Sequence, residues 1–114
     1  MASGRETGKR LLFLCSRNRL RSPTAHEIFS DRPGIEVDSA GLAPDAEVPL
    51  SSEQVEWADL ILVMETNHRV TLKRRFGRWL RGTRIVVLGI PDHYEFMDPD
   101  LIDRLEKACR PFLR

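Results

Sequence analysis

Hydrophobic residues fall into short clusters separated by polar, glycine-containing or proline-containing stretches. Four clusters, at residues 11–14, 35–39, 58–64 and 85–88, have the length and the apolar or alternating character of β-strands. The first and third are nearly continuous apolar runs, which is typical of strands buried on both faces of a parallel sheet. The segment 35–39 alternates apolar and polar residues, so we expect it to be more exposed.

Helices are predicted between and after these strands. Ser22-Pro23 suits a helix start, with Ser22 as the N-cap, and Pro33-Gly34 would end that helix. Further helices are predicted to begin at about residues 51, 66 and 98, and the one from residue 66 is predicted to end near Gly77. The alternation predicts an α/β fold: a three-layer, doubly wound, four-stranded parallel sheet with helices on both faces. Ligands of such sheets bind beyond the carboxyl ends of the strands, where the strand order reverses.

Composition limits the classes of protein that fit this pattern. The 114 residues suffice for one modest core, and the formal net charge of +1 does not by itself favour nucleic acid. With only two cysteines, free thiols in a reducing compartment are the simpler expectation. The N-terminus does not resemble a signal peptide, and the apolar run 60–64 is too short to span a bilayer. We therefore expect a flexible leader at residues 1–8, a single domain at residues 9–114 and a cytoplasmic location, with no membrane partner.

A Cys-x5-Arg-Ser motif connects the first predicted strand to the first predicted helix. Such a loop can direct successive backbone N–H groups at one anion, and the helix N-terminus adds positive potential. Arg21 can supply two parallel hydrogen bonds to a phosphoryl group. Asn18 suits the left-handed backbone conformation that so tight a loop requires. The predicted phosphate-binding residues are Ser16, Arg17, Asn18, Arg19, Leu20, Arg21 and Ser22.

Cys15 stands at the base of this predicted cradle. The positive potential favours its thiolate, which is a strong nucleophile. Ser22 could donate its hydroxyl to the sulfur and ease the departure of sulfur from phosphorus. These residues predict a phosphatase that works through a cysteinyl-phosphate intermediate, with catalytic residues Cys15, Arg21 and a general acid.

Two aspartates could protonate the leaving oxygen. Asp92 follows the fourth predicted strand, at the same sheet edge as Cys15, whereas Asp98 precedes Pro99 and suits a helix N-cap. We favour Asp92 as the acid and keep Asp98 as the alternative. The expected mechanism requires no metal or organic cofactor.

The segment from Cys15 to Pro23 resembles the signature loop of the low-molecular-weight protein tyrosine phosphatases. Residues 38–41, 57–64 and 90–94 are similar to three further segments of that family, in the same order. The resemblance implies that Ser39 supports Asn18, that Asp92 is the acid, and that Tyr94 walls the substrate cleft beside His93. It also implies hydrolysis of phosphotyrosine or another aryl phosphate, on a phosphorylated protein or a small substrate, with inorganic phosphate or sulfate able to occupy the loop.

Two other functions remain open from the sequence alone. The loop could serve a non-enzymatic sensor of phosphate or phosphoproteins. The basic segment 73–84 could bind nucleic acid, although a solvated helix face is the simpler interpretation and makes nucleic acid an unlikely partner. His26 and His68 have no partners at metal-ligand spacing, so we expect them on the surface or on helix faces and predict no metal site.

Overall fold

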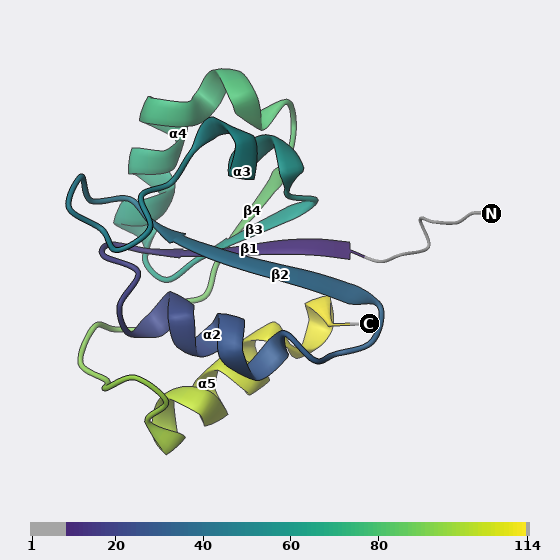
Figure 1. Ribbon diagram of the computed structural model, residues 1–114, viewed down its shortest axis with the longest axis vertical. Helices are drawn as coiled ribbons and strands as arrows, with labels where there is room; N and C mark the ends of the chain where they lie inside the picture. The colour runs from purple at the N-terminus through teal and green to yellow at the C-terminus, as the bar shows by residue number, and fades with distance from the viewer. Residues whose placement is uncertain (1–8, 114) are drawn as a thin grey trace.

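The computed structural model describes residues 9–113 and contains a parallel sheet with helices on both faces (Figure 1). The predicted leader at residues 1–8 lies outside the described residues. The strands are β1 (Lys9–Cys15), β2 (Ile35–Gly41), β3 (Leu60–Val63) and β4 (Arg84–Val87). The helices are α2 (Arg21–Phe29), α3 (Ser52–Trp57), α4 (Thr66–Leu80), α5 (Pro99–Cys109) and the 3-10 turn η1 (Arg110–Phe112). The predicted fold class is confirmed.

The strand order β2-β1-β3-β4 creates the switch point at β1. This strand pairs in parallel with β2 on one side, for example Phe13 with Ser39, and with β3 on the other, where Phe13 pairs with Leu62. Chain connections therefore leave β1 and β3 towards opposite faces of the sheet, which opens a crevice beyond their carboxyl ends. Cys15 is the last residue of β1, so the candidate loop begins at this crevice.

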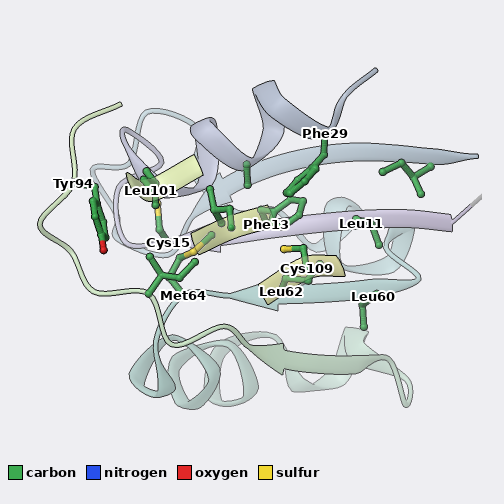
Figure 2. Close-up of a cluster of buried hydrophobic side chains, with 14 residues drawn as sticks. Leu11, Phe13, Cys15, Phe29, Leu60, Leu62, Met64, Tyr94, Leu101 and Cys109 are labelled. Atoms are coloured by element: carbon green, nitrogen blue, oxygen red, sulfur yellow. The ribbon is translucent and has the colours of Figure 1, made fainter. Parts of the chain in front are cut away.

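Alternate residues of the strands fill two separate cores. Leu11 and Phe13 of β1 face α2 and α5, where Phe13 stacks on Phe29 at 5.7 Å between ring centroids (Figure 2). Leu12 and Leu14 face α3 and α4. This division explains why β1 is apolar from Leu11 onward, since a strand with helices on both sides has no polar face there. Together the two cores hold the end of β1 rigidly at the sheet edge.

Two helix boundaries differ from the prediction. Helix α2 begins at Arg21 with Leu20 in the N-cap position, so Ser22 lies inside the helix instead of capping it. Helix α4 continues past Gly77 to Leu80, because Leu80 adds another buried turn to the apolar face. It ends where Arg81 and Gly82 both adopt positive φ, at 48° and 83°. Within residues 9–113, no helix is both long enough and apolar enough to cross a membrane.

Candidate active site

The loop between β1 and α2 has its carbonyl groups turned outward and its amide groups unused. Backbone N–H groups of the segment 42–47 donate to the carbonyl oxygens of Cys15, Ser16 and Arg17, at 2.9, 2.7 and 3.0 Å. Among residues 9–113, no acceptor takes a hydrogen bond from the backbone N–H groups of residues 16–20. A series of unpartnered amide groups at a helix N-terminus is an arrangement suited to an anion.

Gly41, at the end of β2, lets the loop pack against its neighbours. A Cβ atom at this position would lie 2.7 Å from the carbonyl oxygen of Ser16 and 2.5 Å from the Cβ of Ala46. Only glycine fits so close an approach without displacing backbone. Asn18, at the turn of the loop, has φ of 57°, as the sequence predicted for this position.

A short hydrogen-bonded chain joins Asn18 to the candidate nucleophile. The side-chain amide of Asn18 donates to Ser22 Oγ at 2.9 Å, and Ser22 Oγ lies 2.9 Å from Cys15 Sγ. Because the serine oxygen accepts from Asn18, its own proton is directed at the sulfur. All three side chains are buried, so these contacts are protected from competing water.

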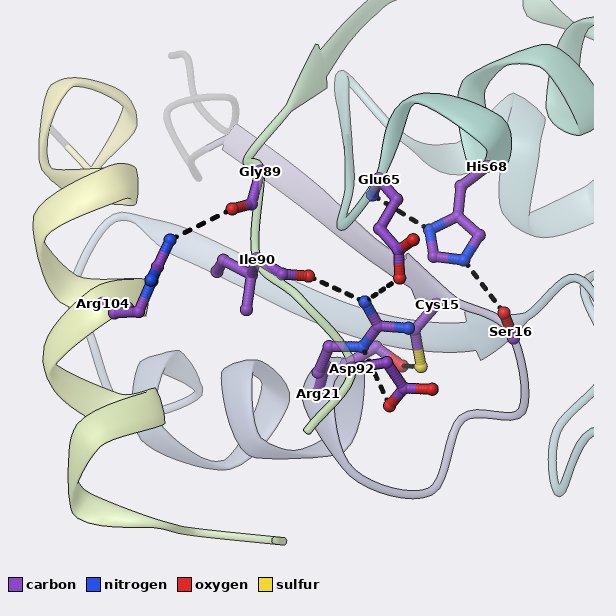
Figure 3. Close-up of polar contacts among 10 residues, drawn as sticks. Cys15, Ser16, Arg21, Glu65, His68, Gly89, Ile90, Asp92 and Arg104 are labelled. Atoms are coloured by element: carbon purple, nitrogen blue, oxygen red, sulfur yellow. Dashed lines mark hydrogen bonds and ion pairs between the residues drawn. The ribbon is translucent and has the colours of Figure 1, made fainter. Parts of the chain in front are cut away.

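Arg21 is held by three residues from two segments of the chain. Its Nη1 donates to a carboxylate oxygen of Glu65, in a short contact, and to the carbonyl oxygen of Ile90 at 2.7 Å (Figure 3). Asp92 Oδ1 lies 3.6 Å from its Nε. With Nη1 occupied, an anion that takes the place of Asp92 at Nε would meet the edge formed by Nε and Nη2 in two parallel hydrogen bonds. The side chain is 2% exposed, so its orientation is fixed by these partners.

The two candidate acids occupy different places. Asp92 lines the same pocket as Cys15 and Arg21, and its carboxylate is 60% exposed. Asp98 is the N-cap of α5, where its Oδ1 accepts a hydrogen bond from the backbone N–H of Asp100 at 2.9 Å. The geometry therefore brings Asp92, and not Asp98, to the candidate nucleophile.

Charged side chains of the loop form the rim of this pocket. Arg17 pairs with Asp45 at 3.5 Å, and Arg19 pairs with Glu47 at 3.3 Å. All four side chains are more than half exposed, so each pair contributes little to stability and can exchange partners readily. Leu20 supplies the apolar part of the lining.

Two residues expected at the substrate cleft do not line this pocket. Tyr94 is 9% exposed and belongs to the core cluster that contains Leu101 of α5, beside which Figure 2 shows it. His93 is exposed, and its ring lies 4.3 Å from that of Tyr94. The pocket is lined by Cys15, Ser16, Arg17, Arg19, Leu20, Arg21 and Asp92. The expected aromatic wall is therefore replaced by charged side chains.

Ser39 also has a different partner from the one expected. Its hydroxyl lies 2.9 Å from His26 Nδ1, while the amide of Asn18 is engaged by Ser22. Ser39 thus joins β2 to α2, and Asn18 is supported from within its own loop.

Sequence reasoning missed two residues at the start of α4. Glu65 binds Arg21, and His68, which was expected on a surface or helix face, is 2% exposed and lies 3.0 Å from Ser16 Oγ through its Nε2. Burial lowers the pKa of His68 below its ordinary value of 6.5, and the charge of Arg21 lowers it further against the opposing carboxylates Glu65 and Asp92. The available signal was position, since both residues lie within five residues of the end of β3, a strand that pairs with β1.

Several arginines of the basic segment 73–84 make contacts within the protein. Arg75 donates to the carbonyl oxygen of Leu42 at 2.6 Å, and Arg81 pairs with Glu56 at 3.7 Å. Arg78 and Arg84 lie over the rings of Trp79 and Phe112. Trp79 also contacts Phe76, so it does not present a free face for stacking on a base. These contacts favour the solvated-face interpretation. The described residues contain no group of three or more His, Cys, Asp or Glu side chains that could hold a metal ion.

Comparison with known proteins identifies the fold. No protein-family model matches the chain. It superposes on the low molecular weight protein tyrosine phosphatase from Streptococcus pyogenes with a TM-score of 0.76, over 92% of this chain and 91% of that one, at 15% identity. This chain has the low-molecular-weight phosphatase fold. The resemblance seen in the loop motif is thereby confirmed, and it extends through all four strands.

Other matches agree with the low-molecular-weight phosphatase fold. Wzb of Vibrio vulnificus, in a complex with benzylphosphonate, superposes with a TM-score of 0.74 over 92% of this chain and 97% of that chain, at 22% identity. The protein-arginine-phosphatase of Geobacillus stearothermophilus is 29% identical over 91 residues, which cover 59% of this chain and 62% of that protein. The chain spans less than two thirds of the length of the curated relatives it matches.

Proposed function

We propose that this protein is a cysteine-dependent phosphatase, with Cys15 as nucleophile, Arg21 as phosphate ligand and Asp92 as general acid. The single observation that carries the proposal is the convergence of these three side chains on one pocket, at the mouth of a loop with unpartnered amide groups. An anion receptor without chemistry needs the amides and the arginine. It does not need a buried thiol that receives a hydrogen bond from Ser22, nor a carboxylate that lines the same pocket as that thiol.

The reaction proceeds in two displacements. The Cys15 thiolate attacks phosphorus, the bond from phosphorus to the leaving group breaks, and Asp92 gives its proton to the leaving atom. Asp92, now a carboxylate, removes a proton from water, and the resulting hydroxide displaces the sulfur from phosphorus. Inorganic phosphate leaves and Ser22 stabilises the returning thiolate by its hydrogen bond.

Arg21 balances charge through both displacements. Its Nε and Nη2 bind two equatorial oxygens while Glu65 and Ile90 hold Nη1. Glu65 also offsets the positive charge of Arg21 when the pocket contains no anion. A buried arginine without that carboxylate would carry a large desolvation cost.

The substrate we propose is a phosphorylated side chain of a protein. Phosphotyrosine and other aryl phosphates remain the first candidates by resemblance of the loop. Phosphoarginine is the second candidate, because two curated relatives carry the name protein-arginine-phosphatase and because the pocket lacks the stacking surface expected from Tyr94. Either leaving group requires protonation, so Asp92 has the same role in both reactions.

The test is hydrolysis of para-nitrophenyl phosphate by the purified chain in the presence of a chelator. We expect turnover that Cys15→Ser abolishes and that Asp92→Asn lowers by about 10²- to 10⁴-fold for poor leaving groups. Asp98→Asn is the control, because it changes a helix cap that does not line the pocket and should retain the rate. Tight phosphate binding without turnover would instead establish a sensor. Parallel assays of phosphotyrosine and phosphoarginine peptides decide between the two substrate classes.

A further inference from the structure

A buried histidine connects the start of α4 to the loop that carries Cys15. His68 Nδ1 lies 3.1 Å from the backbone nitrogen of Glu65, and Nε2 lies 3.0 Å from Ser16 Oγ (Figure 3). The ring is 2% exposed, so these two contacts replace water on both nitrogens.

The contacts determine which nitrogen carries the proton. The backbone N–H of Glu65 can only donate, so Nδ1 must be the unprotonated nitrogen that accepts. A neutral ring then carries its proton on Nε2 and donates it to Ser16 Oγ. A positively charged ring would place a proton on Nδ1 against the N–H of Glu65. It would also face Arg21 of α2, although Glu65 and Asp92 oppose that repulsion.

Ser16 is consequently fixed at two atoms. Its carbonyl oxygen accepts from the backbone N–H of Ala43 at 2.7 Å, and its hydroxyl accepts from His68. Ser16 directly follows Cys15, so its peptide group is the first of the unpartnered amides beside the sulfur. Fixing this residue determines where the first amide of the cradle points.

We propose that His68, as the neutral ring protonated at Nε2, is a positioning residue that holds Ser16 and so orients the first amide of the phosphate loop. This inference rests on the proposed function and adds a residue from outside the loop to it. Its effect is on anion affinity and on the rate of phosphoryl transfer, because a misdirected amide loses its hydrogen bond to phosphorus-bound oxygen.

Two substitutions of His68 distinguish the contact made by Nδ1 from the contact made by Nε2. The amide nitrogen of glutamine reaches the place of Nε2, so His68→Gln keeps the donor to Ser16. Asparagine reaches only the place of Nδ1, so His68→Asn keeps the contact with Glu65 and loses the one with Ser16. We expect His68→Asn to weaken inorganic phosphate binding and to lower kcat/KM by about 3- to 10-fold, and His68→Gln to rescue most of both. Equal losses in the two variants would overturn the proposal.

A double-mutant cycle tests the pairing itself. Ser16→Ala, His68→Asn and the double variant should show the same loss, because the second change removes nothing further. Additive losses would show that the two side chains act independently and would overturn the proposal. His26→Ala is the control, since it breaks a serine–histidine contact of 2.9 Å that does not involve the loop.

Nitrogen-15 NMR of the wild-type chain tests the inference without any substitution and without a measurement of turnover. The proposal requires His68 to show an unprotonated Nδ1 and a protonated Nε2 at neutral pH. The reverse tautomer would overturn it. If the chain binds phosphate but hydrolyses no ester, the proposed function fails, whereas the tautomer and the effects on phosphate affinity still decide the role of His68.

Discussion

The hydroxyl oxygen of Ser22 lies 2.9 Å from the sulfur of Cys15, inside the first turn of the helix that follows the loop. The side-chain amide of Asn18 donates a hydrogen bond to the oxygen of that hydroxyl, so the hydroxyl proton points to the sulfur. The sulfur therefore contacts a side-chain hydroxyl at the N-terminus of α2, where the helix dipole also favours negative charge.

Replacement of Ser22 by alanine removes this hydrogen bond and leaves the amide of Asn18 without an acceptor. Since hydrogen bonds to charged groups contribute about 1.5–3 kcal/mol, we expect roughly a 10- to 100-fold loss of kcat. Stopped-flow measurement should show an initial burst of product, because loss of the stabilised thiolate slows breakdown of the cysteinyl-phosphate. Ser30→Ala, on the exposed end of the same helix, should leave both steps unchanged. Unaltered kcat in Ser22→Ala would contradict this role.

Gly41 should not tolerate a side chain. The methyl group of Gly41→Ala would meet backbone atoms of Ser16 and Arg17 below 3.0 Å, so the loop must move. We expect a loss of about 1–3 kcal/mol in the free energy of unfolding, together with weaker phosphate binding. Urea denaturation and phosphate titration measure the two effects.

Gly77→Ala supplies the control for that change. An added Cβ at Gly77, inside α4, meets nothing within 4 Å. We expect it to stabilise the chain by about 0.5–1 kcal/mol, since alanine is the better helix former. Equal effects of the two substitutions would show that close approach at Gly41 is not the cause.

Replacement of Thr24 should slow the hydrolysis only of substrates whose leaving group must be protonated by an acid. Its Oγ1 donates to the carbonyl oxygen of Leu20 and accepts from the backbone N–H of Met97, so it ties the loop that carries Asp92 to the end of the phosphate loop. Met97 has φ of 61°, an unfavourable conformation that needs such an anchor. We expect Thr24→Val to lower kcat/KM about tenfold for alkyl phosphates and little for an activated aryl phosphate.

Thr24→Ser keeps the hydroxyl and should retain the rate on both kinds of leaving group. A uniform loss across leaving groups in Thr24→Val would instead indicate damage to the phosphate loop. The measurement is kcat/KM plotted against the pKa of the leaving group.

Acid should destabilise the chain partly through His68. The pKa of this ring is lowered by burial and then by Arg21, so the unfolded chain binds its proton more readily. Stability therefore rises with pH through the interval from the lowered folded value up to the ordinary value of 6.5, and falls as pH decreases through it. We expect the Tm of His68→Gln to fall less steeply than that of wild type between neutral pH and pH 5. The exposed His93 offers the control, and His93→Gln should keep the wild-type slope.

The sequence predicted the parts of this molecule that depend on local pattern. Alternating apolar segments identify the sheet, and the spacing of Cys15 and Arg21 identifies the loop, because both features are encoded within a few residues. The position of Asp98 was predictable for a similar reason, whereas Asp92 as the general acid stays a prediction. A Pro at the following position marks Asp98 as a helix cap, and the structure has it there.

Contacts between distant segments were beyond such reasoning. Ser22 has the residue type of an N-cap, yet the N-cap lies two residues earlier, at Leu20, and the helix directs the Ser22 hydroxyl inward. Tyr94 has the residue type of a cleft wall, yet it fills the core beside α5. Glu65 and His68 belong to a helix whose register against β1 is set by packing, which no single segment encodes.

Cys109 has a consequence for the chemistry of oxidation. It lies on the buried face of α5, and burial raises the pKa of its thiol to about 12. At neutral pH this thiol is almost entirely protonated, so it is a slow nucleophile towards an oxidised sulfur. A sulfenic acid formed on Cys15 by peroxide would therefore be reduced faster by soluble thiols than by the second cysteine of its own chain. Survival of the nucleophile under oxidising conditions then depends on the reductant around the protein and not on an internal disulfide.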